Sequence, residues 1–185
     1  MPTISSFISL SLDGCYADAG GDTSWAHNQD PEQAEFTRSN ASGESRLMFG
    51  RTTYDMMASF WPTPAAAQMM PEVASAMNKS AKLVASRTMT SASWENTTIA
   101  PDLIAAASQL RSGSGPDAVI LGSGSIVAQL MNASLLDELQ VMWVPVSLGG
   151  GKRLFDGATR LINWKVAETR SFRATGNTFI RYRQA

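Results

Sequence analysis

Apolar and small polar residues alternate along the first segment of the chain, TISSFISLSL (residues 3–12), which ends in Asp-Gly. A period of two predicts a β-strand that enters a loop. Residues 164–172 and 177–184 alternate in the same way on either side of RATG, a pattern that predicts a closing β-hairpin. Further apolar runs predict buried strands at 45–49, 81–86, 95–100, 117–121 and 137–146.

Helical spacing of apolar residues appears between these strands. Residues 51–61 carry Tyr54, Met57, Ala58 and Trp61 on one face, and similar faces recur from Asp102 to Gly113 and after Gly124. The segment 62–80 is compatible with either a loop or a short helix.

A further short helix is expected after a loop of about fifteen residues, a length that usually marks a functional segment. Its start combines Asp30 as N-cap, Pro31 at the first helical position and Gln33 as the return partner of a capping box.

About eight strands with about four interleaved helices indicate an α/β fold. The sheet is expected to be mostly parallel with an antiparallel edge. We find no repeat and no linker, so residues 1–185 are expected to form one domain.

Composition narrows the possible partners. The net charge is −1 and the basic residues are scattered, which argues against nucleic acid or a membrane as partner and favours small molecules. One cysteine and one histidine exclude a Cys/His zinc cluster, and we expect no metal site. No signal peptide and no apolar run of the roughly 20 residues that span a bilayer are present, so we expect a cytoplasmic protein.

The helix at 51–61 begins with an arginine directly after Gly50. A helix N-terminus carries partial positive charge, so Arg51 sits where a cation is disfavoured. Either this arginine reaches away from the helix end, or a bound anion lies over the same helix start and pairs with it.

A second turn of this kind is VILGSGSIV. Gly122 and Gly124 would let a phosphate approach the free N–H groups of the following helix, although a plain tight turn explains the glycines equally. The Rossmann fingerprint fails here because Val127 takes the place of its third glycine. With SRT at 86–88 after a third strand, the turns together favour a dinucleotide, which has a pyrophosphate and a ribose to hold.

Six segments in order resemble the dihydrofolate-reductase-like superfamily, in particular the reductase domain of the bifunctional riboflavin-biosynthesis deaminase–reductase and its stand-alone relatives. They are FISLSLDG, LMFGRTTYDMM, LVASRT, VILGSGSIVAQLM, DELQVMWVPVSLGGGKRLF and TFIRYR. The resemblance implies NADPH as cofactor and a mixed, mostly parallel sheet of about eight strands, flanked by helices and ending in an antiparallel hairpin. The resemblance covers the reductase half alone, so we expect no deaminase half in this chain.

The resemblance also implies site residues. Gly50, Arg51, Thr52 and Thr53 would lie beside the cofactor phosphates. Ser86, Arg87 and Thr88 would meet the adenosine ribose and its 2′-phosphate. Gly122, Ser123, Gly124, Ser125 and Ile126 would form the turn at the pyrophosphate, and Ala17 would bracket the nicotinamide.

Candidate substrate and catalytic residues are fewer. Glu35 is either an acid that contacts substrate or a solvated residue on a helix face, and Asp13 either contacts substrate or forms its turn. Trp25 either stacks on a heterocycle or pins its loop. His27 either contacts substrate or donates a proton, or it is incidental.

We therefore expect an NADPH-dependent reductase that acts on a small pterin-like or pyrimidine-like substrate. The alternative is a non-catalytic nucleotide-binding module. A homodimer is also expected, because the strands VMWVPV and TFIRYR carry more apolar and aromatic groups than one sheet face needs.

Overall fold

The computed structural model describes residues 1–41 and 45–185. The strands are β1 (Ile4–Leu10), β2 (Cys15–Ala17), β3 (Arg46–Gly50), β4 (Lys82–Ala85), β5 (Thr97–Ala100), β6 (Ala118–Leu121), β7 (Glu138–Trp143), β8 (Lys152–Arg153), β9 (Trp164–Ser171) and β10 (Thr178–Gln184). The helices are η1 (Ser24–Ala26, a 3₁₀ turn), α1 (Pro31–Ala41), α2 (Arg51–Phe60), α3 (Pro64–Met69), α4 (Pro71–Lys79), α5 (Leu103–Ser112) and α6 (Gly124–Asn132).

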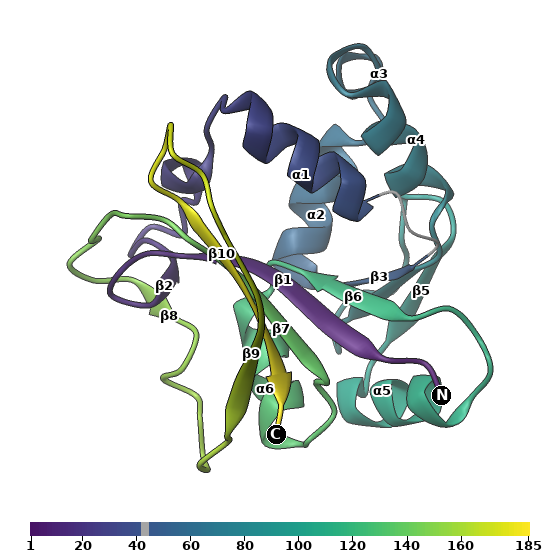
Figure 1. Ribbon diagram of the computed structural model, residues 1–185. Coiled ribbons are helices and arrows are strands. Elements are labelled where there is room, and N and C mark those ends of the chain that lie inside the picture. The colour runs from purple at the N-terminus through teal and green to yellow at the C-terminus, as the bar shows by residue number, and fades with distance from the viewer. Residues whose placement is uncertain (42–44) are drawn as a thin grey trace.

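Eight strands form one twisted sheet in the order β5-β4-β3-β6-β1-β7-β10-β9 (Figure 1). The six strands from β5 to β7 pair in parallel, whereas β10 is antiparallel to both β7 and β9. The predicted α/β fold, with a mostly parallel sheet and a closing antiparallel hairpin, is confirmed.

Helices cover both faces of the sheet because successive strand residues point to opposite sides. In β3, Leu47 and Phe49 pack with Tyr54 of α2, while Met48 between them joins the cluster that includes α5 and α6. Figure 1 shows α1 to α4 above the sheet and α5 and α6 below it. The sheet is therefore the middle layer of three.

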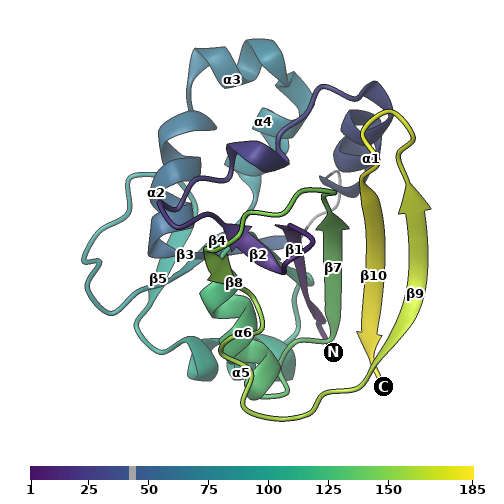
Figure 2. The same ribbon diagram turned by 90° about the vertical axis from the view of Figure 1, so that its left-hand side faces the viewer.

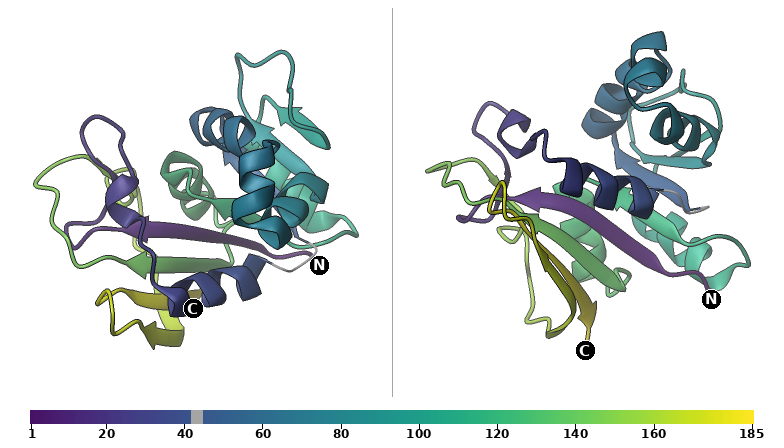
Figure 3. Two further views of the ribbon diagram at one scale, coloured as in Figure 1. Left: turned by 90° about the horizontal axis from the view of Figure 1, so that it is seen from above. Right: turned by 45° about the horizontal axis from the view of Figure 1, so that its top comes forward.

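The antiparallel half of the sheet has its own apolar cluster under α1. The Phe36 ring of α1 lies 4.7 Å from the Phe179 ring and 5.6 Å from the Phe172 ring, both edge-on. Figure 3 shows α1 over the half of the molecule that contains β1, β7 and β10. Arg38 of α1 also lies 3.9 Å from Glu72 of α4. Asp30 caps α1 as predicted, since its carboxylate accepts from Glu32 N (3.0 Å).

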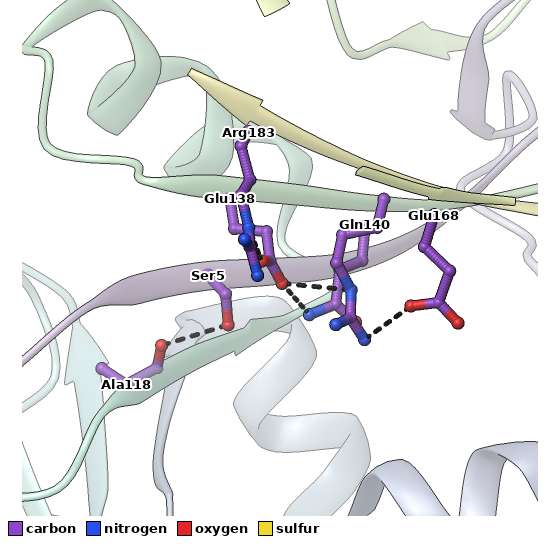
Figure 4. Close-up of polar contacts among 7 residues, drawn as sticks. Ser5, Ala118, Glu138, Gln140, Glu168 and Arg183 are labelled. Atoms are coloured by element: carbon purple, nitrogen blue, oxygen red, sulfur yellow. Dashed lines mark hydrogen bonds and ion pairs between the residues drawn. The ribbon is translucent and has the colours of Figure 1, made fainter. Parts of the chain in front are cut away.

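Charged side chains gather on one face of β7, β9 and β10 (Figure 4). Glu138 accepts hydrogen bonds from Arg183 (3.1 Å) and Gln140 (2.7 Å), and one of its oxygens lies 3.4 Å from Arg181 Nε. Glu168 pairs with Arg181 at 3.4 Å. These partly exposed pairs are each worth little stability, but they make this end of the sheet strongly polar.

Lys82 of β4 is an unusual strand residue because its side chain is buried. Its ammonium donates to the carbonyl oxygens of Ser80 (2.8 Å), Asn78 (3.0 Å) and Glu95 (3.1 Å), and it lies 4.3 Å from the centre of the Trp94 ring. Burial lowers the pKa of Lys82 to about 8. The lysine thereby ties the end of α4 to the segment before β5.

Three local features differ from the sequence expectations. The ambiguous segment 62–80 forms two helices, α3 and α4. The long loop after β1 contains η1 and also β2, which pairs with β8 in a second, two-stranded sheet. The Gln33 side chain accepts a hydrogen bond from Asn177 (2.8 Å), so it ties α1 to the residue that precedes β10 and is not the return partner of a capping box.

The longest described helix, α1, has 11 residues. Within residues 1–41 and 45–185, no helix has the length and apolar character that crossing a membrane requires.

Candidate functional site

Three strand-to-helix or strand-to-loop turns meet at one edge of the sheet. Strands β3, β4 and β6 are neighbours in parallel, so their carboxyl ends lie side by side. Figure 2 views the molecule from the side on which β1 ends. In open α/β sheets ligands bind outside the carboxyl ends of the strands, which makes this edge the first place to look for a site.

Direct contacts join the first and third turns. The N–H of Gly50, at the start of α2, donates to the Ser123 hydroxyl (3.0 Å), at the start of α6. Ser123 adopts left-handed backbone geometry with φ of 51°, and its hydroxyl also reaches the Leu121 carbonyl (3.3 Å). Thr53 lies beside Gly122, since a Cβ on that glycine would sit 3.7 Å from the threonine methyl. The starts of α2 and α6 are therefore in direct contact, and the region where they meet is called the seam.

Arg51 connects this seam to the second turn. Its guanidinium donates to the Thr88 hydroxyl (2.9 Å) and lies 3.6 Å from the Asp55 carboxylate one turn along α2. The side chain is 54% exposed. The unfavourable place of this cation at a helix start is thus offset from within the chain by Asp55, while the guanidinium still faces solvent at the carboxyl edge.

The second turn is shaped by Ser86. Its hydroxyl accepts from Met89 N (3.1 Å) and more weakly from Thr88 N (3.4 Å), which folds residues 86–89 back on themselves. Arg87 stands exposed on this turn, and Thr52 is exposed at the first turn of α2. Within the described part of the chain, Arg87 has no ion-pair partner.

Tyr16 is a site residue that the sequence analysis missed. Its ring packs directly on Gly124, and a Cβ there would overlap the ring and come within 2.8 Å of Cζ. Burial raises the pKa of the Tyr16 phenol. The glycine of this turn is therefore required by an aromatic neighbour, in addition to any role toward a phosphate.

A cavity of about 350 Å³ adjoins this contact. It lies along α6, and its lining includes Tyr16, Ser125, Gln129, Arg153 and Leu154. Ile126, by contrast, is buried, and its side chain lies 3.4 Å from where a Cβ on Gly50 would stand.

Asp13 joins two loops. Its carboxylate accepts hydrogen bonds from the Ser11 hydroxyl (2.6 Å), Leu148 N (3.2 Å) and Gly149 N (2.9 Å). These bonds, the Ser11 hydroxyl first, hold the pKa of Asp13 below its ordinary value of 3.8. A carboxyl that is ionised and already engaged is a poor proton donor, so Asp13 acts here as a loop anchor.

The other candidate residues make no described hydrogen bond or ion pair with the three turns. Glu35 is 66% exposed and pairs with Arg38 on α1. Trp25 is half-buried in η1, where its indole N–H donates to the Asp22 carbonyl (3.2 Å), and His27 is exposed just after η1. In residues 1–41 and 45–185, no three His, Cys, Asp or Glu side chains gather in a way that could hold a metal ion.

The structure thus brings together most of the expected cofactor residues. Gly50, Arg51, Thr53, Thr88, Gly122, Ser123 and Ile126 are linked by the contacts described above. Ala17 is buried in β2, directly after Tyr16, whose ring packs on Gly124 at the start of α6. No described hydrogen bond or ion pair joins Glu35, Trp25 or His27 to these cofactor residues.

Comparison with solved structures shows the same fold elsewhere. A protein from Shewanella sp. PV-4 that is named for riboflavin biosynthesis superposes with a TM-score of 0.77, at 23% identity, over 99% of each chain. The diaminohydroxyphosphoribosylaminopyrimidine deaminase/5-amino-6-(5-phosphoribosylamino)uracil reductase of Thermotoga maritima superposes with a TM-score of 0.69 at 13% identity. That match covers all of this chain and 57% of the bifunctional protein.

Sequence comparison gives the family. The uncharacterized protein YyaP of Bacillus subtilis (strain 168) is 26% identical over 165 residues, which cover 89% of this chain and 86% of YyaP. The family model described as the RibD C-terminal domain matches residues 2–176. The chain therefore belongs to the RibD C-terminal domain family.

Proposed function

We propose that the protein is an NADPH-dependent reductase that transfers a hydride to a small pterin-like or pyrimidine-like heterocycle. The observation that carries this proposal is the seam at the carboxyl edge, where the Gly50–Ser123 and Arg51–Thr88 contacts join three turns. Membership of a reductase-type family supports it.

The residues at this edge fit a dinucleotide phosphate. In the proposal, the turn at Gly122 and Ser123 offers backbone N–H groups to the pyrophosphate. Arg51 and Arg87 hold the 2′-phosphate through charge-assisted hydrogen bonds, because both are exposed at the same edge. Ala17 brackets the nicotinamide. Bound NADPH would supply a hydride, and the substrate would take up this hydride and one proton, leaving NADP⁺.

The substrate class rests on family relatives and not on the geometry. The Thermotoga maritima enzyme is named for the reduction of a phosphoribosylaminouracil, which is a pyrimidine. We propose that this chain reduces a heterocycle of related chemistry. Asp13 is held ionised by three donors, and Glu35 is solvent-exposed. We therefore propose that water supplies the proton that the substrate takes up and that Asp13 anchors its loop.

A second candidate function is a nucleotide-binding module without catalysis. It is favoured by the contacts of the two expected acids, because neither Asp13 nor Glu35 is placed as a proton donor. In this alternative the phosphate turns bind NADPH, but no substrate reacts.

Two measurements separate these possibilities. Calorimetry first tests whether NADPH binds, and loss of NADPH absorbance then tests turnover with dihydrofolate, a dihydropterin, 5-amino-6-(5-phosphoribosylamino)uracil and a quinone. Binding with turnover of one heterocycle supports the reductase. Binding without turnover across the panel supports the module, and absence of NADPH binding rules out both.

A further inference from the structure

We propose that Gly151 is a positioning residue that fixes the backbone at Ala17 and, through it, the nicotinamide end of the cofactor. The proposal rests on the proposed function, because Ala17 is assigned to the nicotinamide there. Gly151 itself lies in the segment 146–154, named here the clamp segment, which also holds Asp13 and lines part of the cavity along α6.

The first observation is steric. A Cβ on Gly151 would overlap the carbonyl oxygen of Ala17 and lie 3.0 Å from Asp18 Cα. Both atoms belong to the backbone, so neither can turn aside as a flexible side chain would. Gly151 also has φ of 142°, which L side chains rarely adopt. No other residue type fits this position while the loop at Ala17 keeps its place.

The second observation is pairing. Strand β8 of the clamp segment pairs with β2, with Ala17 opposite Lys152 and Cys15 opposite Arg153. Beyond the strand, Leu154 N donates to the Gly14 carbonyl (3.1 Å). The backbone from Gly14 to Ala17 is therefore held by the residues that directly follow Gly151.

The third observation is a separate anchor at the other end of the clamp segment. Leu12 N donates to the Val146 carbonyl (2.8 Å), and Asp13 accepts from Leu148 N and Gly149 N. Residues 12–17 and the clamp segment thus run together over their whole length. A displacement at Gly151 must be passed to Ala17, because the anchor at Asp13 prevents the clamp segment from moving away as a unit.

This arrangement predicts an uneven effect on the two ends of NADPH. The turns around Arg51 and Arg87 contact neither the clamp segment nor β2 by any described hydrogen bond. A change at Gly151 should therefore disturb the nicotinamide end and leave the 2′-phosphate end intact. General destabilisation of the protein would weaken both ends alike.

The test compares Gly151→Ala with Gly150→Ala. A Cβ on Gly150 meets nothing within 4 Å and its φ lies outside the left-handed region, so this neighbour is a matched control. Calorimetry measures the Kd of NADPH and of adenosine 2′,5′-bisphosphate, which carries only the adenine end. We expect Gly151→Ala to weaken NADPH by about tenfold and lower its turnover by up to about a hundredfold, as misplacement by about 1 Å can. Its Kd for the bisphosphate should stay within about twofold of wild type.

Equal weakening of both ligands, or NADPH binding and turnover like wild type, overturns the proposal. Amide hydrogen exchange of residues 12–18 adds a readout that needs no ligand: it should be faster in Gly151→Ala and unchanged in Gly150→Ala. If wild type binds no NADPH, the proposed function fails, while unchanged exchange in Gly151→Ala specifically removes the positioning role. Should Gly151→Ala not fold, Asp13→Ala, which removes all three hydrogen bonds of the other anchor, must weaken NADPH and leave the bisphosphate unchanged in the same way.

Discussion

Gly50 N donates to the Ser123 hydroxyl across 73 residues of sequence, at 3.0 Å. This bond joins the N-cap residues of α2 and α6, two helices whose starts face the same edge. It also satisfies a backbone donor that α2 would otherwise leave open, since the first N–H groups of a helix have no partner within it.

Ser123→Ala should therefore lower both stability and cofactor affinity. Loss of one hydrogen bond of this kind costs about 1 kcal/mol of unfolding free energy, which urea titration would measure. Ser125→Ala is the control because Ser125 is exposed on the same turn. Equal unfolding midpoints for the two variants would contradict the role of the Gly50–Ser123 bond.

NADPH should bind more tightly than NADH. The two differ by one 2′-phosphate, and a charge-assisted hydrogen bond to arginine is worth on the order of 1.5–3 kcal/mol, or about ten- to a hundredfold in Kd. Arg87→Ala should weaken NADPH strongly and NADH little, by calorimetry. Arg173→Ala, at the tip of the β9–β10 hairpin, should change neither. Equal wild-type Kd values for the two nucleotides would disprove the assignment of Arg51 and Arg87.

Gly124 and Tyr16 should be energetically coupled. Gly124→Ala forces a methyl group into the Tyr16 ring, and overpacking of this kind typically costs about 1–3 kcal/mol. In a Tyr16→Ala background the same change should cost little, because the space is then free. A double-mutant cycle by thermal unfolding measures this coupling, and additive effects would show that the ring can move aside without cost.

The loop anchor at Asp13 should depend on pH. Because the folded pKa lies below the ordinary value of 3.8, the carboxylate contributes stability that is present above 3.8 and is lost as pH falls through the folded pKa. Wild type should thus exceed Asp13→Asn in unfolding free energy at neutral pH, and the gap should shrink below pH 3.8. A gap that is constant across pH would mean that the charge of Asp13 plays no part.

We propose that the chain forms a homodimer through β9, the last strand of the sheet. Val166 on this strand is 60% exposed, and edge strands are usually covered or protected. Light scattering at micromolar concentration should give twice the 19.9 kDa of one chain. Val166→Lys should shift the mass toward the single chain, whereas Ile104→Lys, on the exposed face of α5, should not. A wild-type mass of 19.9 kDa would refute the proposal.

The sheet and its helices could be predicted because each carries a local signal. Period-two alternation in β1 and helical spacing in α2 are visible within a dozen residues. Asp30 caps α1 as predicted, and α5 begins directly after Asp102, where a helix start was expected. The meeting of the three turns at one edge was also predictable, since the carboxyl ends of parallel strands lie side by side.

The contacts of Tyr16 and Gly151 could not be predicted in the same way. Each joins segments more than a hundred residues apart, and neither a tyrosine after a cysteine nor a third consecutive glycine shows what will pack against it. The position of Glu35 was equally open, because α1 buries only a narrow stripe around Phe36 and the spacing did not tell which face would bear the acid.

The buried ammonium of Lys82 has a practical consequence. The other lysines, Lys79, Lys152 and Lys165, are exposed, so an amine-reactive reagent should modify them while the protein stays folded. Lys82 can react only when β4 separates from the end of α4 and the three hydrogen bonds from its ammonium to carbonyl oxygens break. The rate of Lys82 labelling, followed by mass spectrometry, would therefore measure how fast β4 and the end of α4 separate.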